Sequence, residues 1–511
     1  MTTRALMVLG TASDAGKSLT AAALCRIMRQ DGYNVAPFKA QNMSLNSFAT
    51  REGQEIGRAQ AMQAQAAGIE PHVDMNPILL KPTSDIESQV ILNGRVLGNY
   101  KGAHYYELKP MLLEAVAAAY RRLSSRHEII VLEGAGSPVE MNLKDRDVVN
   151  LKMAEIADAQ CLLVADIDRG GVFASLIGTY SLLEPDERKR FCGFLINKFR
   201  GDVSLFSPGI DYLEARLAQN CLGVIPYLYD HGIDDEDSVS VERRAIGTPS
   251  VANGNKLSIC IVGYPYLSNF TDFTALERVP GVIVYYTRRP DEAKSADVLI
   301  LPGSKNTISD LLWLKESGWA STISEHIGAR KPLVGICGGF QMLGREITDP
   351  HCVESKVKRI SGLSLLNVTT VLTGDKITRQ ATAKLRNSSL FGNGISDPSF
   401  NGYEIHLGET VLRDGSESLL RLRRSGDTED RYDGAVTSDG MILGTYLHGL
   451  FDSAEALEFF INYWRRILGK EQVRGNFRDP LVEREKRYDF LAAHYRQHLK
   501  LNLVYEALGL A

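Results

Sequence analysis

Short apolar runs alternate with amphipathic stretches along residues 1–230. The apolar runs predict strands at 4–9, 33–38, 128–133, 161–166, 191–196 and 221–226. The stretches between them repeat apolar residues at helical spacing and predict helices at 17–31, 54–68, 108–124, 150–158, 173–182 and 209–219. Strands that alternate with helices form a parallel sheet with helices on both faces. Residues 1–230 are therefore predicted to form a doubly wound α/β domain.

A polar segment separates this domain from a second one. Residues 231–256 are acidic at first and then rich in glycine, proline, serine and asparagine, which is typical of a linker. The alternation restarts at 257, with strand-like runs in KLSICIVGYP, GVIVYYT, ADVLILPGSKNT and KPLVGICGG. An amphipathic helical tail covers 454–508. The predicted fold class is α/β with two doubly wound parallel-sheet domains, and the second domain, 257–511, includes the tail.

The run LVGICGGFQMLG places a single cysteine, Cys337, between a buried strand and a helix. Apolar or small residues precede the thiol and two glycines follow it, so the cysteine is expected on a tight turn. A thiol at a helix N-terminus is stabilised as the thiolate by the helix dipole. The glycines let backbone N–H groups approach an oxyanion. The pattern favours a nucleophilic cysteine over a buried structural one.

A nucleophilic thiol needs a histidine, which the fold brings close from a distant part of the sequence. His448, in MILGTYLHGLF, follows an apolar run and precedes a glycine, so it is expected at the end of a strand. His406, in NGYEIHLGE, is the second candidate. The remaining histidines stand in charged or irregular surroundings and are expected to face solvent. We therefore predict that His448 is the partner of Cys337.

The chain begins with a strand, a glycine-rich turn and a helix that carries Gly16-Lys17-Ser18 at its start. In such a loop, backbone N–H groups surround phosphates, the lysine neutralises them, and the hydroxyl can hold Mg²⁺. The spacing between Gly10 and Gly16 is one residue longer than in the usual phosphate loop. The loop residues predicted to bind a nucleotide are Gly10, Thr11, Asp14, Ala15, Gly16, Lys17 and Ser18.

Polar residues follow several predicted strands of the first domain, at the sheet edge where α/β proteins bind ligands. Lys39, Glu133, Asp166 and Asn197 each stand at or directly after the end of a predicted strand. Glu133 and Asp166, together with Ser18, are suited to coordinating Mg²⁺ directly or through water. Lys39 and Asn197 join the predicted nucleotide site. For each of these residues the alternative is a helix cap or a surface ion pair.

Charge and cysteine usage exclude several other functions. The 58 basic and 62 acidic residues give a net charge of −4 without a dense basic tract, which argues against a nucleic-acid partner. No apolar stretch is long enough for a membrane helix, so no membrane partner is expected. The seven cysteines form no C-x-x-C pair, which indicates a reducing, cytoplasmic location. The oligomeric state is left open, a homo-oligomer included.

Two chemistries are thus predicted in one chain. A Cys–His pair with an oxyanion hole hydrolyses an amide or an ester. A nucleotide site activates a second group, and a carboxylate is activated as an acyl phosphate. Joined, they predict glutamine hydrolysis in the second domain and ATP-driven amide formation in the first.

Several motifs resemble those of one family. GTASDAGKS, NPILLKP and EGAGS are similar to dethiobiotin synthetase, which shares the longer glycine spacing, whereas KAQNMSLNSF and DIDRGGVFAS resemble corrinoid-amidating enzymes. SNFTDF, LPGSKNT, GICGGFQMLG, GYEIHLG and TYLHGLFD resemble the class I glutamine amidotransferase domain of the same enzymes. The resemblance covers essentially the whole chain and is to the cobyric acid synthase family of cobalamin biosynthesis. It implies a P-loop NTPase-like first domain and a glutamine amidotransferase-like second domain.

The resemblance implies a ligase that uses ATP, Mg²⁺, glutamine and a corrinoid substrate. Cys337 would form a γ-glutamyl thioester, and His448 would carry the proton to the leaving ammonia. The ammonia would amidate the b, d, e and g carboxylates of adenosylcobyrinic acid a,c-diamide through acyl phosphates, giving adenosylcobyric acid. The other residues implied are Gly303 and Gly338 as oxyanion donors, Gln341 as a glutamine contact, Lys17, Ser18, Lys39 and Glu133 around the phosphates and Mg²⁺, and Asn42, Asn46, Asp166, Asp168 and Arg169 as substrate or metal contacts.

One residue departs from the pattern of class I amidotransferases. These enzymes usually carry His-x-Glu, but Gly449 and Leu450 follow His448 here. This chain resembles the corrinoid-amidating branch, in which cysteine and histidine form a dyad without that glutamate. Glu404 and His406 are the candidates for orienting His448. Three alternatives stay open: a cobyrinic acid a,c-diamide synthase, a ParA-like regulatory ATPase, and an inactive amidotransferase module that only binds a partner. The loop lacks the early second lysine that is typical of the regulatory ATPases.

Overall fold

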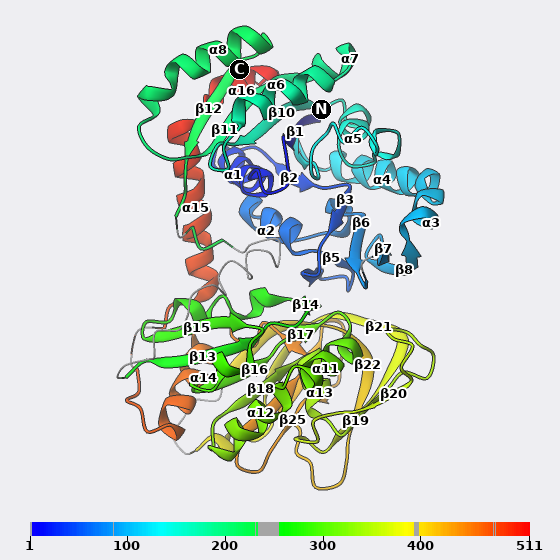
Figure 1. The fold of residues 1–511 in the computed structure, drawn as a ribbon, viewed down its shortest axis with the longest axis vertical. Helices are drawn as coiled ribbons and strands as arrows, with labels where there is room; N and C mark the ends of the chain where they lie inside the picture. The colour runs from blue at the N-terminus through cyan, green and yellow to red at the C-terminus, as the bar shows by residue number, and fades with distance from the viewer. Residues whose placement is uncertain are drawn as a thin grey trace.

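The computed structural model describes residues 3–84, 86–229, 231–233, 255–392, 398–473, 475 and 477–510. Two units lie one above the other, the N-terminal unit at the top of Figure 1 and the C-terminal unit below it. Most of the predicted linker, 231–256, lies outside the described residues. Within the described part of the chain, no helix has the length and apolar character needed to span a membrane.

The N-terminal unit contains a six-stranded parallel sheet. Its strands are, in spatial order, β12 (Cys221–Pro226), β11 (Phe191–Phe199), β10 (Gln160–Asp166), β1 (Arg4–Gly10), β9 (Ile129–Glu133) and β2 (Val35–Phe38). The helices are α1 (Lys17–Gln30), α2 (Arg58–Ala67), α3 (Gly102–Glu107), α4 (Lys109–Ser124), α5 (Leu151–Ile156), α6 (Val172–Leu182), α7 (Pro185–Arg188) and α8 (Ser207–Leu217). The six predicted strands and six predicted helices are confirmed to within a few residues at their ends.

The two faces of this sheet bury two separate apolar cores. Leu6 and Val8 of β1 pack in a core with α1, whereas Met7 and Leu9 pack in a core with α4, α5, α6 and α8. This alternation follows from the two-residue side-chain period of a strand. Both faces are therefore apolar and covered, as expected for a central strand of a doubly wound sheet.

A smaller sheet, which the sequence analysis does not predict, extends the N-terminal unit toward the lower unit. It consists of β3 (Gln41–Met43), β6 (Ile78–Pro82), β7 (Glu87–Leu92) and β8 (Arg95–Lys101), and the hairpin β4 (Ser47–Ala49) with β5 (Glu55–Gly57) lies next to it. The apolar runs of these strands are shorter than those of the central sheet, for example Ile78–Leu80 in β6 and Val90–Leu92 in β7, and polar residues occupy other positions of each strand.

The C-terminal unit contains a second parallel sheet and a mixed sheet. The first is ordered β15 (Val282–Thr287), β13 (Leu257–Val262), β16 (Val298–Leu301), β18 (Leu333–Ile336) and β26 (Ile442–Thr445), with β25 (Ala435–Val436) antiparallel at its edge. The second contains β20 (Arg359–Ser361), β19 (Glu346–Thr348), β21 (Val368–Leu385), β22 (Ser399–Leu412), β27 (Leu447–His448), β23 (Leu420–Arg424) and β24 (Arg431–Asp433). Also present are the pair β14 (Leu267–Ser268) and β17 (Gly303–Ser304), and the helices α10 (Pro290–Ala293), α11 (Thr307–Glu316), α12 (Trp319–Gly328), α13 (Gly338–Leu343) and α14 (Ala454–Ile467).

The end of the chain packs on the N-terminal unit. Helix α15 (Pro480–His498) leaves the lower unit and runs along the side of the upper one, and α16 (Leu501–Ala507) follows it there (Figure 1). Leu491 and Tyr495 join the core that contains α1, and Arg26 of α1 pairs with Asp489 at 2.8 Å. The sequence analysis groups this tail with the second domain, because an amphipathic pattern does not say which core its apolar face covers.

The two units also meet beside the small sheet. The backbone N–H of Phe270 donates to Asn46 Oδ1 at 3.2 Å, and the backbone N–H of Ser47 donates to Asn269 Oδ1 at 3.3 Å. The long hairpin of β21 and β22 contacts β4 from below. The KAQNMSLNSF and SNFTDF runs, which are distant in sequence, therefore lie against each other at the junction of the units.

Candidate active site

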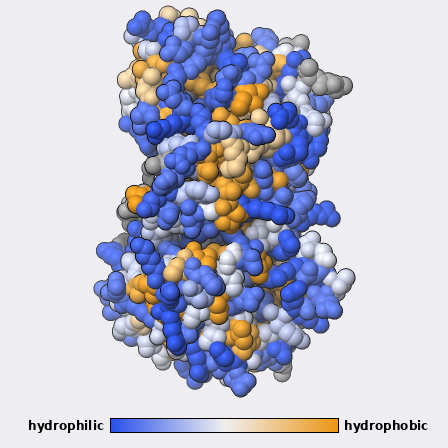
Figure 2. Space-filling view, turned by 90° about the vertical axis from the view of Figure 1, so that its right-hand side faces the viewer, coloured by the Kyte–Doolittle hydropathy of each residue, from blue (hydrophilic) through white to orange (hydrophobic). Residues whose placement is uncertain are grey.

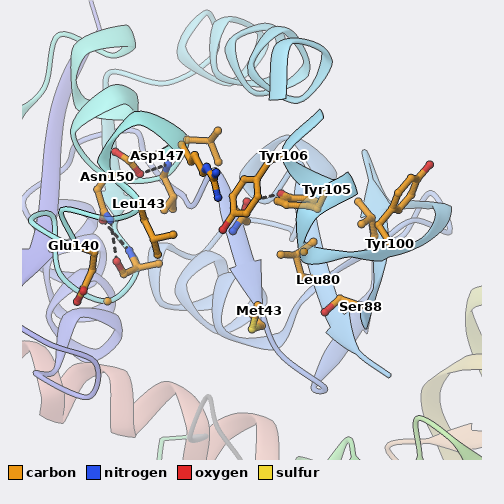
Figure 3. A pocket seen from close by; sticks show the side chains of 18 of the residues that line it. Met43, Leu80, Ser88, Tyr100, Tyr105, Tyr106, Glu140, Leu143, Asp147 and Asn150 are labelled. Atoms are coloured by element: carbon orange, nitrogen blue, oxygen red, sulfur yellow. Dashed lines mark hydrogen bonds between the residues drawn. The ribbon is translucent and has the colours of Figure 1, made fainter. Parts of the chain in front are cut away.

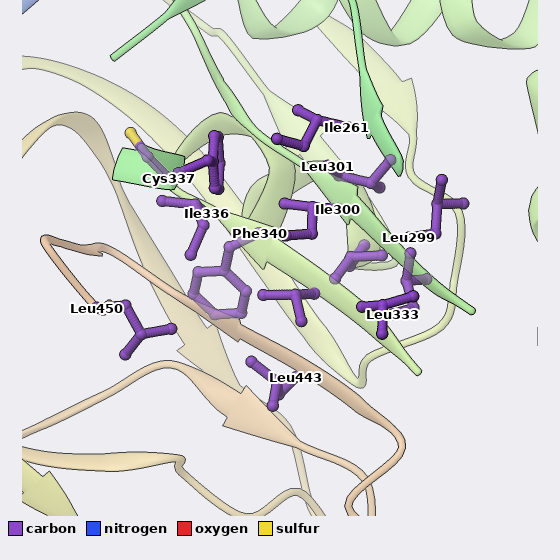
Figure 4. Close-up of a cluster of buried hydrophobic side chains, with 14 of the residues drawn as sticks. Ile261, Leu299, Ile300, Leu301, Leu333, Ile336, Cys337, Phe340, Leu443 and Leu450 are labelled. Carbon is purple, nitrogen blue, oxygen red and sulfur yellow. The ribbon is translucent and has the colours of Figure 1, made fainter. Parts of the chain in front are cut away.

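Cys337 lies on the turn between β18 and α13, as predicted. Its backbone has φ 51° and ψ −109°, a conformation that non-glycine residues rarely adopt and that turns of this kind impose on a nucleophile. Position 339, two residues after Cys337, requires glycine, because a Cβ on Gly339 would lie 1.9 Å from the carbonyl oxygen of Leu301. Figure 4 shows Cys337 at the margin of the apolar cluster of this unit, with its sulfur directed away from the neighbouring side chains.

His448 faces Cys337 and is held by a carboxylate. Its Nδ1 lies 2.7 Å from Asp272 Oδ2, and its ring stacks on Tyr403 with centroids 5.2 Å apart. Burial opposes the charged imidazole, but the Asp272 carboxylate and hydrogen bonding to the Cys337 thiol together raise the pKa of His448 to about 10. Cys337, His448 and Asp272 thus form a thiol–imidazole–carboxylate series, which is the arrangement of a nucleophile, its base and the group that orients the base.

Asp272 replaces the glutamate that class I amidotransferases usually place after the histidine. It belongs to SNFTDF, which the sequence analysis quotes only as a family motif, and it is 176 positions from His448 in sequence. Within the described residues, neither candidate for orienting His448 forms a hydrogen bond or an ion pair with it. Glu404 pairs with Arg424 at 2.6 Å, and His406 Nδ1 lies 3.1 Å from the Gly408 carbonyl oxygen.

We expect Asp272→Asn to lower the kcat of glutamine hydrolysis about 10²- to 10⁴-fold, since the imidazole loses its orienting carboxylate. Asp272 raises the pKa of His448, so its removal lowers that pKa, and the imidazolium that protonates ammonia is then lost at a lower pH. The alkaline limb of the rate–pH profile should therefore move to lower pH. Ammonia release measured across pH tests this, with the exposed Asp291→Asn as the matched control; an unchanged profile would contradict the role.

The predicted oxyanion and glutamine contacts lie around the same thiol. A Cβ on Gly303 would lie 3.6 Å from His448 Cε1, and a Cβ on Gly338 would lie 2.9 Å from the backbone nitrogen of Ser304. Gln341 lines the small cavity beside Cys337, where its amide nitrogen donates to the Leu407 carbonyl oxygen at 2.8 Å. Gln341 is therefore part of the cavity wall, and Gly303 and Gly338 lie next to residues that line it, His448 and Ser304. The roles of all three residues in catalysis stay predictions.

The phosphate loop connects β1 to α1. Gly16 has φ 103°, and a Cβ there would lie 2.0 Å from Asn197 Nδ2, so only glycine fits at this position. Asn197 Nδ2 donates to the Ala15 carbonyl oxygen at 2.9 Å, and the backbone N–H of Thr11 donates to Val164 at 2.9 Å. These bonds fix the loop from the ends of the neighbouring strands β10 and β11.

Three predicted residues converge next to the loop. Glu133, at the end of β9, accepts from Ser18 Oγ at 2.8 Å and pairs with Lys39 at 2.9 Å. Gln63, which the sequence analysis misses, donates to the other oxygen of Glu133 at 2.5 Å. A hydroxyl and a buried carboxylate at this distance fit Mg²⁺, because it binds oxygen ligands and keeps several waters and phosphate oxygens.

The predicted metal ligand Asp166 lies in another cluster at the same edge. Its Oδ2 pairs with Lys198 at 2.9 Å and lies 3.6 Å from Arg169. Arg169 also pairs with Asp14 of the loop at 2.8 Å, and Asp168 pairs with Arg200. Among the described residues, Asp166 makes no contact with Ser18 or Glu133. Asp166, Asp168 and Arg169 thus form ion pairs, the alternative considered for each of them, and their roles as metal or substrate contacts stay predictions.

The two predicted asparagines are buried. Asn42 Nδ2 donates to Gln60 Oε1 at 2.8 Å, and Asn46 contacts Phe270 at the junction of the units. Their observed contacts are thus within the protein, and Asn46 supports the segment that leads to Asp272.

A cavity of about 680 Å³ opens beside the phosphate loop. Figure 3 shows Tyr105 and Tyr106 on one side of it and Leu143 and Asn150 on the other. Gly136 lines the cavity, and its carbonyl oxygen accepts from Lys17 Nζ at 3.1 Å. Figure 2, in which the right-hand side of Figure 1 faces the viewer, shows apolar surface on the N-terminal unit. The cavity therefore combines apolar walls with one lining residue, Gly136, that is hydrogen-bonded to the phosphate loop.

Strand β6 separates this cavity from the small cavity beside Cys337. Leu80 and Pro82 line the large cavity, whereas Lys81, between them in sequence, lines the cavity that contains Cys337 and His448. The alternation of side chains along a strand explains this division. One strand of the N-terminal unit is thus a wall of both sites.

Comparison with known proteins agrees with both sites. The model of the CobQ/CobB/MinD/ParA nucleotide binding domain matches residues 6–235, and that of the CobB/CobQ-like glutamine amidotransferase domain matches residues 258–456. The fold and its sites therefore define a glutamine amidotransferase domain joined to a nucleotide-binding domain.

Curated relatives match the chain along its whole length. The cobyric acid synthase of Syntrophobacter fumaroxidans is 47% identical over 99% of this chain and 99% of its own length. Those of Desulforamulus reducens and Salmonella choleraesuis are 46% and 47% identical, over 99% and 98% of this chain and 98% of each relative. The chain belongs to the cobyric acid synthase family and is a glutamine-dependent ligase.

Proposed function

We propose that this protein converts adenosylcobyrinic acid a,c-diamide to adenosylcobyric acid by amidating the b, d, e and g carboxylates. The observation that carries the proposal is the arrangement of two sites on the two faces of β6, a thiol–imidazole–carboxylate series on one face and a large cavity beside a phosphate loop on the other. The first site suits release of nitrogen from glutamine, and the second suits activation of an acid.

At the first site, Cys337 attacks the side-chain amide of glutamine and forms a γ-glutamyl thioester. His448 takes the thiol proton and gives it to the leaving ammonia, while Asp272 holds the imidazole in position. Backbone N–H groups near Gly303 and Gly338 receive the oxyanion. Water then hydrolyses the thioester to release glutamate and the thiol.

At the second site, the phosphate loop binds ATP with Lys17 against the phosphates. Ser18 and Glu133 would hold Mg²⁺, which supplies charge neutralisation of the phosphates when bound. Lys39 stands beside Glu133, where it can neutralise a carboxylate or phosphate oxygen. The γ-phosphoryl group passes to a carboxylate of the substrate, and ammonia displaces phosphate from the resulting acyl phosphate.

The large cavity is the proposed site of the corrinoid. A corrin has an apolar ring and a rim of acids and amides, and the cavity offers apolar walls with polar groups at its edge. Its contact with the phosphate loop through Gly136 would bring a rim carboxylate near the γ-phosphate.

Mass spectrometry of the reaction products tests the function. The protein, incubated with ATP, Mg²⁺, glutamine and adenosylcobyrinic acid a,c-diamide, should convert four acids to amides and consume one ATP for each. No amidation of the a,c-diamide, together with amidation of the a and c positions when cobyrinic acid is supplied in its place, would identify the related a,c-diamide synthase instead. ATP hydrolysis without any amide product would favour a regulatory ATPase.

The cavity assignment predicts a selective effect of Met43→Asp. Met43 lines the cavity and is 57% exposed, so a polar residue is tolerated there, but a new carboxylate repels the acids of the corrinoid. We expect the KM for the corrinoid to rise about 10-fold, with the KM values for ATP and glutamine unchanged. Leu205→Asp, at an apolar residue that is 81% exposed and outside the cavity, is the matched control. Equal behaviour of the two variants would remove the corrinoid from this cavity.

A further inference from the structure

The cavity beside Cys337 contains more charge than the thiol chemistry needs. Lys81, Lys305, Lys376 and Glu354 line it together with the catalytic side chains. Lys81 and Lys376 both bind the buried Glu55, at 2.9 and 2.5 Å, so two of the lysines share one carboxylate. The other two charged groups need a separate explanation.

Lys305 is a buried cation that has no ionic partner among the residues that the structure describes. It follows β17 in the LPGSKNT motif and is 8% exposed. Within the described residues, its ammonium group forms no salt bridge or hydrogen bond. Burial lowers the pKa of Lys305, and Glu354 opposes this change only from a distance. A buried ammonium destabilises the fold unless a counter-charge is supplied.

Glu354 is the complementary anion of the cavity. Its Oε2 accepts the backbone N–H of Thr307 at 3.0 Å, which fixes the carboxylate close to the start of α11. Burial raises the pKa of Glu354, and Lys305 lowers it through space. The charge of each side chain affects the pKa of the other, but the two form no ion pair among the described residues. A small ligand with one positive and one negative group could therefore pair with both.

The charges match those of a free amino acid. A γ-amide carbonyl held at Cys337 places the α-carbon about 4 Å farther into the cavity, by the lengths of three carbon–carbon bonds. The cavity wall offers Lys305 to an α-carboxylate and Glu354 to an α-ammonium. A peptide-bound glutamine or a simple amide lacks one or both of these charges.

We propose that Lys305 binds the α-carboxylate of glutamine and Glu354 binds its α-ammonium, so that the site selects free glutamine. This proposal rests on the proposed role of Cys337 and adds the residues that determine donor specificity. The sequence analysis does not identify either residue, because a lone lysine in a motif and a lone glutamate in a loop carry no spacing signal.

Ammonia release from three donors tests the proposal. The donors are glutamine, 4-aminobutanamide, which lacks the α-carboxylate, and 4-carbamoylbutanoate, which lacks the α-ammonium. We expect Lys305→Met to lower kcat/KM for glutamine about 10- to 100-fold, mainly through KM, with little change for 4-aminobutanamide. Glu354→Gln should do the same for glutamine and leave 4-carbamoylbutanoate almost unaffected. Lys294→Met, at a surface lysine of the same unit, is the matched control.

Two results would overturn the proposal. An equal loss with all three donors would mean that the variants damage the site as a whole, and an unchanged KM for glutamine would mean that neither residue contacts it. Cys337→Ala is included to separate the two proposals: if that variant still releases ammonia from glutamine, the proposed function fails irrespective of Lys305 and Glu354.

Discussion

Replacement of Cys337 by alanine should abolish glutamine-dependent amidation and spare amidation driven by free ammonium. The thiol forms the covalent bond to the γ-carbonyl, and no neighbouring group can replace it, so glutaminase activity should fall by at least about 10⁴-fold. Ammonium enters the reaction after this step and meets an intact phosphate loop. Product amides counted by mass spectrometry, with glutamine or with ammonium chloride as the donor, distinguish the two activities.

The matched control is Cys352→Ala, because Cys352 is an exposed cysteine of the same unit. It should retain both activities. Loss of ammonium-driven amidation in Cys337→Ala, with the protein still folded, would assign Cys337 a structural role at the junction of the units. Retained glutaminase activity would refute the nucleophile directly.

Replacement of Lys17 by alanine should remove amide formation with either nitrogen donor. Lys17 is buried in the phosphate loop, where its ammonium group bonds to the carbonyl oxygens of Ala12 and Gly136. Its charge is the one that this loop supplies to the phosphates, and charge neutralisation dominates phosphoryl transfer. We expect the rate of amide formation to fall by at least about 10³-fold, since a single electrostatic donor contributes on this scale.

Lys189→Ala, at an exposed lysine of the same unit, is the control for Lys17→Ala. ATP consumption should be lost together with amide formation, because both depend on the same transfer. Amide formation at the wild-type rate in Lys17→Ala would refute the assignment of the phosphate loop.

Local patterns in the sequence predicted the central sheets and the two reactive turns. The Cys337 turn and the phosphate loop are each encoded by a few consecutive residues, because a strand, a glycine turn and a helix must follow one another in the chain. Glu133, Lys39 and Ser18 were predictable together because the ends of parallel strands meet at one edge. The contacts of these three residues agree with that expectation.

Tertiary contacts decided what the sequence could not reveal. Asp272 reaches His448 from a four-residue 3₁₀ helix, Phe270–Phe273, which is too short to show a hydrophobic period. Asp166 has the residue type of a metal ligand, and the sequence did not reveal its ion pairs with Lys198 and Arg169, because they depend on tertiary geometry. The small sheet with β6 was missed because its short strands are half polar, and with it the wall that the two sites share.

Helices α15 and α16 have a consequence for any attempt to take this protein apart. They pack in the same apolar core as α1 and β1, although the whole C-terminal unit lies between them and those elements in sequence. A fragment that stops at residue 230 would expose Leu24 and Ile27 to water and tend to aggregate. A fragment that starts at 257 would carry two helices with no surface to cover. To be produced without the C-terminal unit, the N-terminal unit would therefore need residues 480–507 as a grafted or co-expressed peptide. Division of the gene between the two units is disfavoured for the same reason.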